Sequence, residues 1–147
     1  MFSYSQVEKA QTWIYQNARP LDLARWRYHF QNGSVADVTE ALRAFQNPDG
    51  GFAHGLEADC WNTESSPMQT WCATEILHEI GMANADPEMV KGILSYLETC
   101  PNFIEGKWIG TIPSNNNFPH APWWNYSDSK GTACEKNNLS RLSEYGG

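Results

Sequence analysis

The residues best suited to chemistry lie in one stretch, AHGLEADCWN, at positions 53–62. His54, Glu57 and Asp59 are the candidate catalytic residues, because an imidazole or carboxylate can act as a general acid or base when its neighbours shift its pKa. Trp61 is a candidate substrate-binding residue. The alternative interpretation is a solvated loop whose polar groups cap the ends of helices.

A second stretch, PSNNNFPHAPWWNYSD at positions 113–128, combines paired tryptophans with polar groups. Aromatic faces suit either a carbocation-forming isoprenoid or a sugar ring. The alternative is an ordered aromatic loop that closes the end of a helical stack. The further candidate substrate-binding residues are Gln69, His120, Trp123, Trp124, Tyr126 and Asp128.

Metal binding is not expected. His54, Asp59, Cys60 and His120 match no standard ligand spacing, and the four cysteines contain no CxxC pair. We therefore predict no metal site, no cofactor and free thiols.

These candidates must be positioned by helices, because strand signals are scarce. Helix caps predict helices over residues 34–45, 66–80 and 86–99. Ser66 with Gln69 reads as a capping box, and Gly81 ends that helix. Two further helices are expected near the N-terminus, one opened by a capping box of Ser5 with Glu8 and one over LDLARWRYHF.

A repeat is visible when the helices are aligned. Its apolar positions recur at an offset of 52, from Val38, Leu42 and Phe45 to Val90, Leu94 and Leu97. Each helix runs into a glycine turn that ends in an aromatic residue, QNPDGGF in the first copy and PNFIEGKW in the second. This pattern indicates stacked α-hairpins, and we expect them to form a right-handed series.

The stretch ALRAFQNPDGGF resembles the QW-type repeat of the terpenoid cyclase and protein prenyltransferase superfamily, also described as the prenyltransferase and squalene oxidase repeat. TWCATEILHEIG resembles the inner helix that follows such a connector. The resemblance covers roughly residues 34–112 and implies an all-α fold in which α-hairpin repeats form part of an α/α toroid. It also implies that Gln46 caps one helix and that Phe52 packs on the next repeat.

The functional residues of that superfamily do not carry over. The acidic motif DxDD is absent, with LEADC the nearest string, and the zinc ligands of the prenyltransferases cannot be placed on this chain. We expect a partial toroid over residues 1–132, followed by an irregular tail over 133–147 that is typical of a truncated or frame-disrupted chain.

Three functions remain open. The first is an enzyme acting on an isoprenoid or another apolar substrate, such as a terpenoid cyclase or prenyl transferase. The second is a carbohydrate-active toroid of the glycoside hydrolase or polysaccharide lyase type, using Glu57 and Asp59. Paired glycosidase carboxylates face each other across a substrate at about 5–9.5 Å, which two positions on one short loop do not readily provide. The third, a non-catalytic helical-repeat module, fits this chain best.

Charge and hydropathy restrict the partners. A net charge of −7 without a basic run argues against nucleic acid. Without a signal peptide or a long apolar run, we expect a cytoplasmic protein with no membrane span. The ligand is expected to be small and either apolar or a sugar. So few helices cannot bury Trp71, Ile76 and the apolar side chains from Met89 to Leu97 all at once. We therefore also expect self-association through exposed helical edges.

Overall fold

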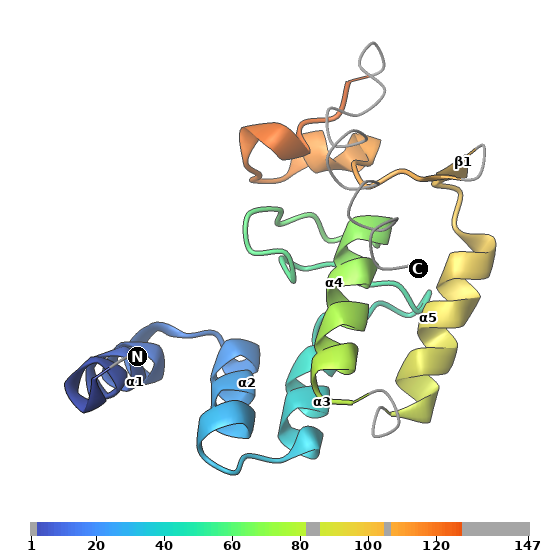
Figure 1. Ribbon diagram of the computed structural model, residues 1–147. Helices are drawn as coiled ribbons and strands as arrows, with labels where there is room; N and C mark the ends of the chain where they lie inside the picture. The colour runs from blue at the N-terminus through green and yellow to red at the C-terminus, as the bar shows by residue number, and fades with distance from the viewer. Residues whose placement is uncertain (1–2, 82–85, 105–106, 128–147) are drawn as a thin grey trace. The chain divides into compact units, whose positions relative to one another are not determined.

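The computed structural model describes residues 3–81, 86–104 and 107–127. This part of the chain is mainly helical, which confirms the predicted fold class at the level of secondary structure (Figure 1). A two-stranded antiparallel sheet and two short 3₁₀ helices complete it. The elements are α1 (Tyr4–Asn17), α2 (Pro20–Phe30), α3 (Val35–Arg43), α4 (Pro67–Glu79), α5 (Pro87–Thr99), β1 (Phe103–Ile104), β2 (Lys107–Trp108), η2 (Pro113–Asn117) and η3 (Pro122–Trp124).

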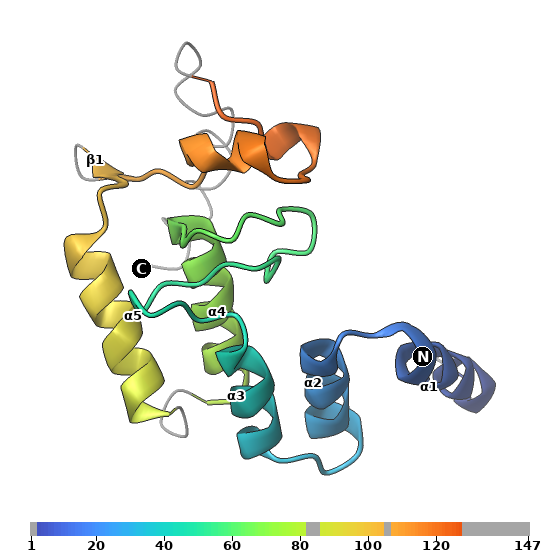
Figure 2. The ribbon, with the colours of Figure 1, turned by 180° about the vertical axis from the view of Figure 1, so that it is seen from behind.

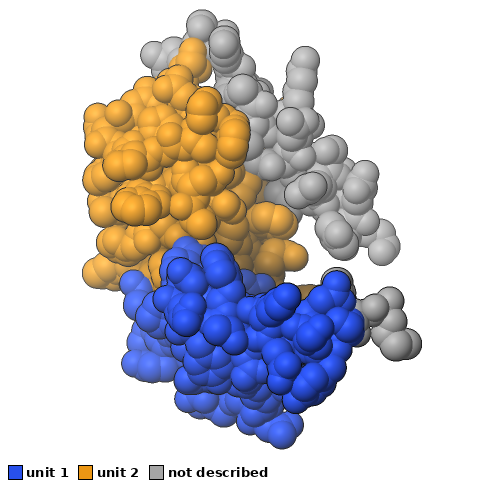
Figure 3. All heavy atoms as spheres, turned by 90° about the vertical axis from the view of Figure 1, so that its left-hand side faces the viewer, with its two compact units in different colours: residues 1–44 blue, residues 45–147 orange. Residues whose placement is uncertain are grey.

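The chain divides into two compact units, residues 1–44 and residues 45–147 (Figure 3). The division falls directly after α3, where the first glycine turn begins. The predicted boundary between residues 132 and 133 lies outside the described residues. None of the described helices is both long and apolar enough to cross a membrane.

Three of the predicted caps are confirmed. The Ser34 side chain accepts a hydrogen bond from Asp37 N, Ser66 from Gln69 N, and Asp86 from the first turn of α5. Gly81 follows α4 with a φ of 85°, the left-handed conformation that glycine adopts most easily.

The predicted start of the first helix is wrong. Ser3, with extended backbone, is the N-cap and forms a capping box with Gln6, so the helix begins at Tyr4. Ser5 and Glu8 are already helical and cannot form the predicted box. The Ser-x-x-Gln spacing at residues 3–6 is also a capping-box motif, and it lies two residues before the predicted one.

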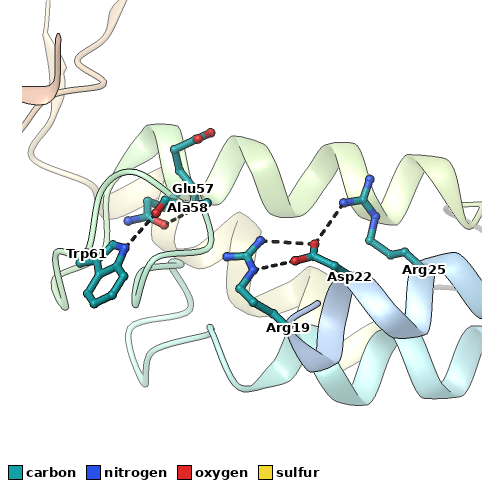
Figure 4. Close-up of polar contacts among 7 residues, drawn as sticks. Arg19, Asp22, Arg25, Glu57, Ala58 and Trp61 are labelled. Atoms are coloured by element: carbon teal, nitrogen blue, oxygen red, sulfur yellow. Dashed lines mark hydrogen bonds and ion pairs between the residues drawn. The ribbon is translucent and has the colours of Figure 1, made fainter. Parts of the chain in front are cut away.

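The first unit contains α1, α2 and α3. Helices α2 and α3 pack against each other, and Leu21, Ala24, Val38 and Leu42 are buried. Helix α1 buries no residue. Arg19 and Arg25 pair with Asp22 at 2.7 and 3.8 Å (Figure 4), and because these side chains are partly exposed the pairs contribute little stability. Tyr15 joins α1 to Gln31, just beyond α2, through a hydrogen bond of 2.6 Å.

The glycine turn at the start of the second unit precedes α4 in the chain and hydrogen-bonds to both α4 and α5. Gly50 N donates to Asn47 O at 2.9 Å, which forms the turn predicted from NPDG. Gln46 Nε2 donates to Met89 O in α5 and to Gly50 O. Phe52 is fully buried, and its N–H donates to the Thr70 hydroxyl in α4. Residues 46–52 therefore hydrogen-bond to both helices, which lie side by side in both views (Figures 1 and 2).

The two connectors share a local structure. Gln46 and Phe52 form an antiparallel bridge, and in the second connector Phe103 pairs with Trp108. The Phe103 and Trp108 rings also contact each other, with centroids 4.5 Å apart. The α-hairpin repeat and the toroid both stay predictions.

The sequence predicts that α5 faces inward with Met89, Val90, Ile93, Leu94 and Leu97, and this prediction is partly wrong. Met89 and Ile93 are buried as expected, but the third buried side chain is Tyr96, whereas Leu94 is 58% exposed. Gly92 lies on the buried face, where an added Cβ would stand 3.3 Å from Gly50 Cα. Because these two glycines approach closely, α5 turns the face with residues 89, 92, 93 and 96 toward the interior, and the face with residues 90, 94 and 97 lies outside it.

Candidate functional site

The loop over residues 53–62 is folded around the side chain of Gln69. Gln69 lies in the first turn of α4 and is 1% exposed. Its amide oxygen accepts from Glu57 N and its amide nitrogen donates to Cys60 O, each at 2.9 Å. The predicted capping box is therefore incomplete, because only the Ser66 half of it forms. The Gln69 side chain instead hydrogen-bonds to two backbone groups of the loop, Glu57 N and Cys60 O.

The two stretches singled out in the sequence do come together. Trp61 N donates to Pro119 O, and Ala121 N donates to Asp59 O, so the segments pair antiparallel around Cys60 and His120. The Trp124 indole N–H donates to Asp59 Oδ1 at 2.5 Å. His120 Nδ1 lies 2.6 Å from Phe118 O, within its own loop. Asp59, Trp61, His120 and Trp124 thus meet at the junction of two loops.

The remaining candidates point elsewhere. His54 Nε2 lies 2.8 Å from Asn47 Oδ1, and because the Asn47 amide nitrogen donates to Thr63 O, the imidazole is the donor. The backbone of Tyr126 forms two hydrogen bonds with the side-chain amide of the exposed Asn116: Asn116 Nδ2 donates to Tyr126 O, and Tyr126 N donates to Asn116 Oδ1. Trp123 is 58% exposed. Asp128 lies outside the described residues.

Trp61 is also exposed, at 61%, but its ring is held in place (Figure 4). Its indole N–H donates to Ala58 O at 2.8 Å, and a Cβ on Gly55 would lie 3.4 Å from the ring. The indole therefore contributes a flat surface rather than a wall of an enclosed pocket.

A buried amide network lies behind these loops. Asn62 is 1% exposed, and its amide nitrogen donates to Ser114 Oγ and to Asn115 Oδ1, each at 2.8 Å. Asn115 in turn donates to Trp124 O at 3.1 Å. Buried amides must find partners, so this network fixes how the 113–124 segment lies on the 53–62 loop.

The cysteines of this region are held as thiols. Burial and, to a smaller extent, the neighbouring Glu57 carboxylate, which accepts the thiol hydrogen at 3.5 Å, together raise the pKa of Cys72 to about 12. Burial also raises the pKa of Cys60, with smaller contributions from Asp59 and Glu57. Neither sulfur has the lowered pKa of a nucleophilic or metal-binding thiolate.

Metal-binding residues do not cluster in the described part of the chain. No group of three or more His, Cys, Asp or Glu side chains there could hold a metal ion.

A cleft of about 990 Å³ opens in the second unit, away from the sequence-predicted candidates. It is formed by the glycine turn at 47–49, residues 63–65, the C-terminal end of α5 and residues 112–117. Its volume is at the upper end of the roughly 300–1,000 Å³ typical of ligand pockets. None of the candidate residues that the structure describes lines it.

Polar and apolar atoms both line this cleft, and most of its lining residues carry a polar group. Nine of its thirteen lining residues carry an amide, hydroxyl or carboxylate, and Asp49 and Glu64 are the acidic ones. Asp49 Oδ1 accepts from Gly51 N and from Ser65 Oγ, so the carboxylate is fixed by the turn. The Asn117 and Glu64 side chains are exposed.

Tyr96 is the single aromatic residue among those lining the cleft. Burial raises its pKa, as does the thiol of Cys100, which donates to the phenol oxygen at 3.3 Å. A hydrogen bond with the Asn102 side chain acts in the opposite direction. Tyr96 is therefore a neutral phenol at physiological pH, seated at the base of a polar cleft.

Sequence reasoning missed this cleft because its residues had structural interpretations. NPDG was assigned to a turn, and it forms that turn while also exposing Asn47 and Asp49 to the cleft. The signal that could have located the cleft is the pairing of Asn with Pro in both connectors, at residues 47–48 and 101–102. Stacked hairpins bring equivalent connectors together at one end.

Comparisons of the chain with family models, with curated proteins and with solved structures find no match.

Proposed function

We propose that this chain is a non-catalytic helical-repeat module, built like part of an α/α toroid, that binds a short oligosaccharide in the cleft between the two connectors. The observation that carries the proposal is the lining, which combines amides, hydroxyls and two carboxylates with three prolines, an isoleucine and one tyrosine. Hydroxyl groups of a sugar can both donate to and accept from such side chains. A site built to hydrogen-bond hydroxyls discriminates against ligands that lack them.

An isoprenoid fits this cleft less well. Carbocation-forming chemistry would need several aromatic faces, whereas Tyr96 is the one ring in the lining. Prenyl substrates also carry a diphosphate, and the described lining contains Asp49 and Glu64 but no arginine, lysine or histidine. Like charges would repel that group.

The contacts of the acidic candidates favour binding without catalysis. The Asp59 carboxylate accepts from the Trp124 indole and helps to join the two loops. Glu57 accepts from the Cys72 thiol. Asp49 and Glu64 are exposed, whereas the general acid of a glycosidase lies in apolar surroundings. Structural hydrogen bonds account for the Asp59, Glu57 and Asp49 carboxylates.

Isothermal titration calorimetry tests the proposal. The probes are short oligosaccharides of glucose, mannose, xylose and N-acetylglucosamine, with farnesyl diphosphate as the contrasting ligand. We expect at least one oligosaccharide to bind and farnesyl diphosphate not to bind. Asn117→Ala and Glu64→Gln should each weaken binding about tenfold, equivalent to about 1.4 kcal/mol.

Trp123→Ala is the matched control, since Trp123 is as exposed as these residues but lies outside the cleft. It should bind like the unmodified chain. Failure of every oligosaccharide to bind, or binding that only Trp123→Ala weakens, would overturn the proposal. Release of reducing ends during incubation would contradict its non-catalytic part.

A further inference from the structure

Helix α5 is apolar on a second face as well as on its buried one. Leu94 is 58% exposed, and Val90 and Leu97, one turn to either side, are half-buried. Spacings of four and three residues place the three side chains in one stripe. Phe103 and Ile104, at 49% and 54% exposed, belong to β1, just beyond the C-terminal end of the helix (Figure 1).

The buried face of α5 is already occupied within the chain. Gln46 bonds to Met89 O on that side, and Gly92 lies against Gly50. The stripe of Val90, Leu94 and Leu97 is thus a separate surface that the described part of the chain leaves accessible. Contiguous exposed apolar side chains of this kind commonly mark an interaction site.

The charges beside this stripe identify the partner. Lys91 and Glu98 are both exposed and lie three residues before and four residues after Leu94. If two copies of α5 pair antiparallel about a twofold axis near Leu94 and Ser95, Lys91 of one copy faces Glu98 of the other. The symmetry forms this pair twice. Among the described residues, the ion pair of Lys91 is a highly exposed contact with Glu88, at 4.0 Å.

We propose that this α5 stripe docks a second copy of the chain, through antiparallel α5 helices with Leu94 at the centre and Lys91–Glu98 pairs on both sides. Opposite charges flanking an apolar seam set orientation as well as partner choice. In a parallel pairing, the same residues of the two copies would lie at the same height along the helices. Lys91 of one copy would then be near Lys91 of the other, and this repulsion between like charges disfavours the parallel arrangement. The exposed Ser95 is small enough to let the helices approach closely.

Light scattering coupled to size-exclusion chromatography, over a range of protein concentrations at low salt, tests this proposal. We expect a mass that rises from 16.6 kDa toward twice that value as concentration increases. Lys91→Glu and Glu98→Lys should each weaken dimerisation at least tenfold, because each places like charges across the interface. The double variant K91E/E98K should restore it.

Leu94→Asp should leave a monomer at every concentration, and since Leu94 is exposed, an unchanged circular dichroism spectrum should show that it folds. Trp13→Glu, at an exposed tryptophan of α1, is the control and should leave dimerisation unchanged. A chain that stays monomeric at high concentration would overturn the proposal. So would a double charge variant that associates no better than the single ones.

Discussion

Gly50 and Gly92 lie backbone against backbone, and a side chain on Gly50 would overlap the Gly92 carbonyl group. Gly50 also has a φ of 87°. Gly50→Ala should therefore lower the free energy of unfolding by about 3 kcal/mol, the sum of left-handed strain and a backbone clash. Urea unfolding followed by circular dichroism measures this. Gly55→Ala is the control, because Gly55 has a φ of 73° but more room, and it should lose only about 1 kcal/mol.

The Gln46 amide is the second link between the glycine turn and α5. Gln46→Met keeps the side-chain length but removes the donor to Met89 O and Gly50 O. Two partly buried carbonyl groups would lose a partner, so we expect a destabilisation of about 2 kcal/mol. Asn116→Ala removes exposed hydrogen bonds to Tyr126 and should cost less than about 0.5 kcal/mol by the same denaturant assay. Equal losses in the two variants would contradict a special role for Gln46.

The Asp59–Trp124 hydrogen bond should hold the two aromatic loops together. In a double-mutant cycle with Asp59→Ala and Trp124→Phe, we expect a coupling energy of about 1–2 kcal/mol, because the acceptor is a carboxylate oxygen and the hydrogen bond is partly buried. Thermal or chemical unfolding of the four proteins provides it. A coupling energy near zero would mean that the backbone pairing of residues 59–61 with 119–121 suffices.

Stability should fall at high pH because of Cys72. Its folded pKa is raised from 9.0 to about 12, so the folded state retains a proton that the unfolded chain loses. The resulting stabilisation is fully present below pH 9 and disappears as the pH rises toward 12. Cys72→Ala should show a shallower loss of stability across that window. Parallel curves for the two proteins would contradict the assigned cause.

Much of the helical framework could be predicted from sequence, because caps are local signals. Ser34, Ser66 and Asp86 each mark a helix that the structure contains. The predicted ends differ from the observed ones by one or two residues. The glycine turn was also predictable, since Asn-Pro-Asp-Gly has few competing conformations.

The inner face of α5 could be predicted only in part, because Met89 and Ile93 are buried as expected whereas Leu94 is exposed. Val90, Leu94 and Leu97 are a better apolar stripe by sequence than Met89, Gly92, Ile93 and Tyr96. The choice depends on Gly92 meeting Gly50, a contact between residues far apart in the chain. Similarly, the cleft residues carry no distinctive motif, and only the packing of two connectors brings Asn47, Asn102 and Asn117 together.

The most direct test of the proposed function is nuclear magnetic resonance of the isotope-labelled chain during titration with the oligosaccharide that binds most tightly. Backbone amides of Thr63, Asn102 and Asn117 report on the cleft, and the indole N–H signals of Trp61 and Trp123 report on the aromatic loops. We predict shifts of the cleft amides on binding, with both indole signals unchanged. Shifts confined to the two indoles, or no shifts with any oligosaccharide, would contradict the cleft as the binding site.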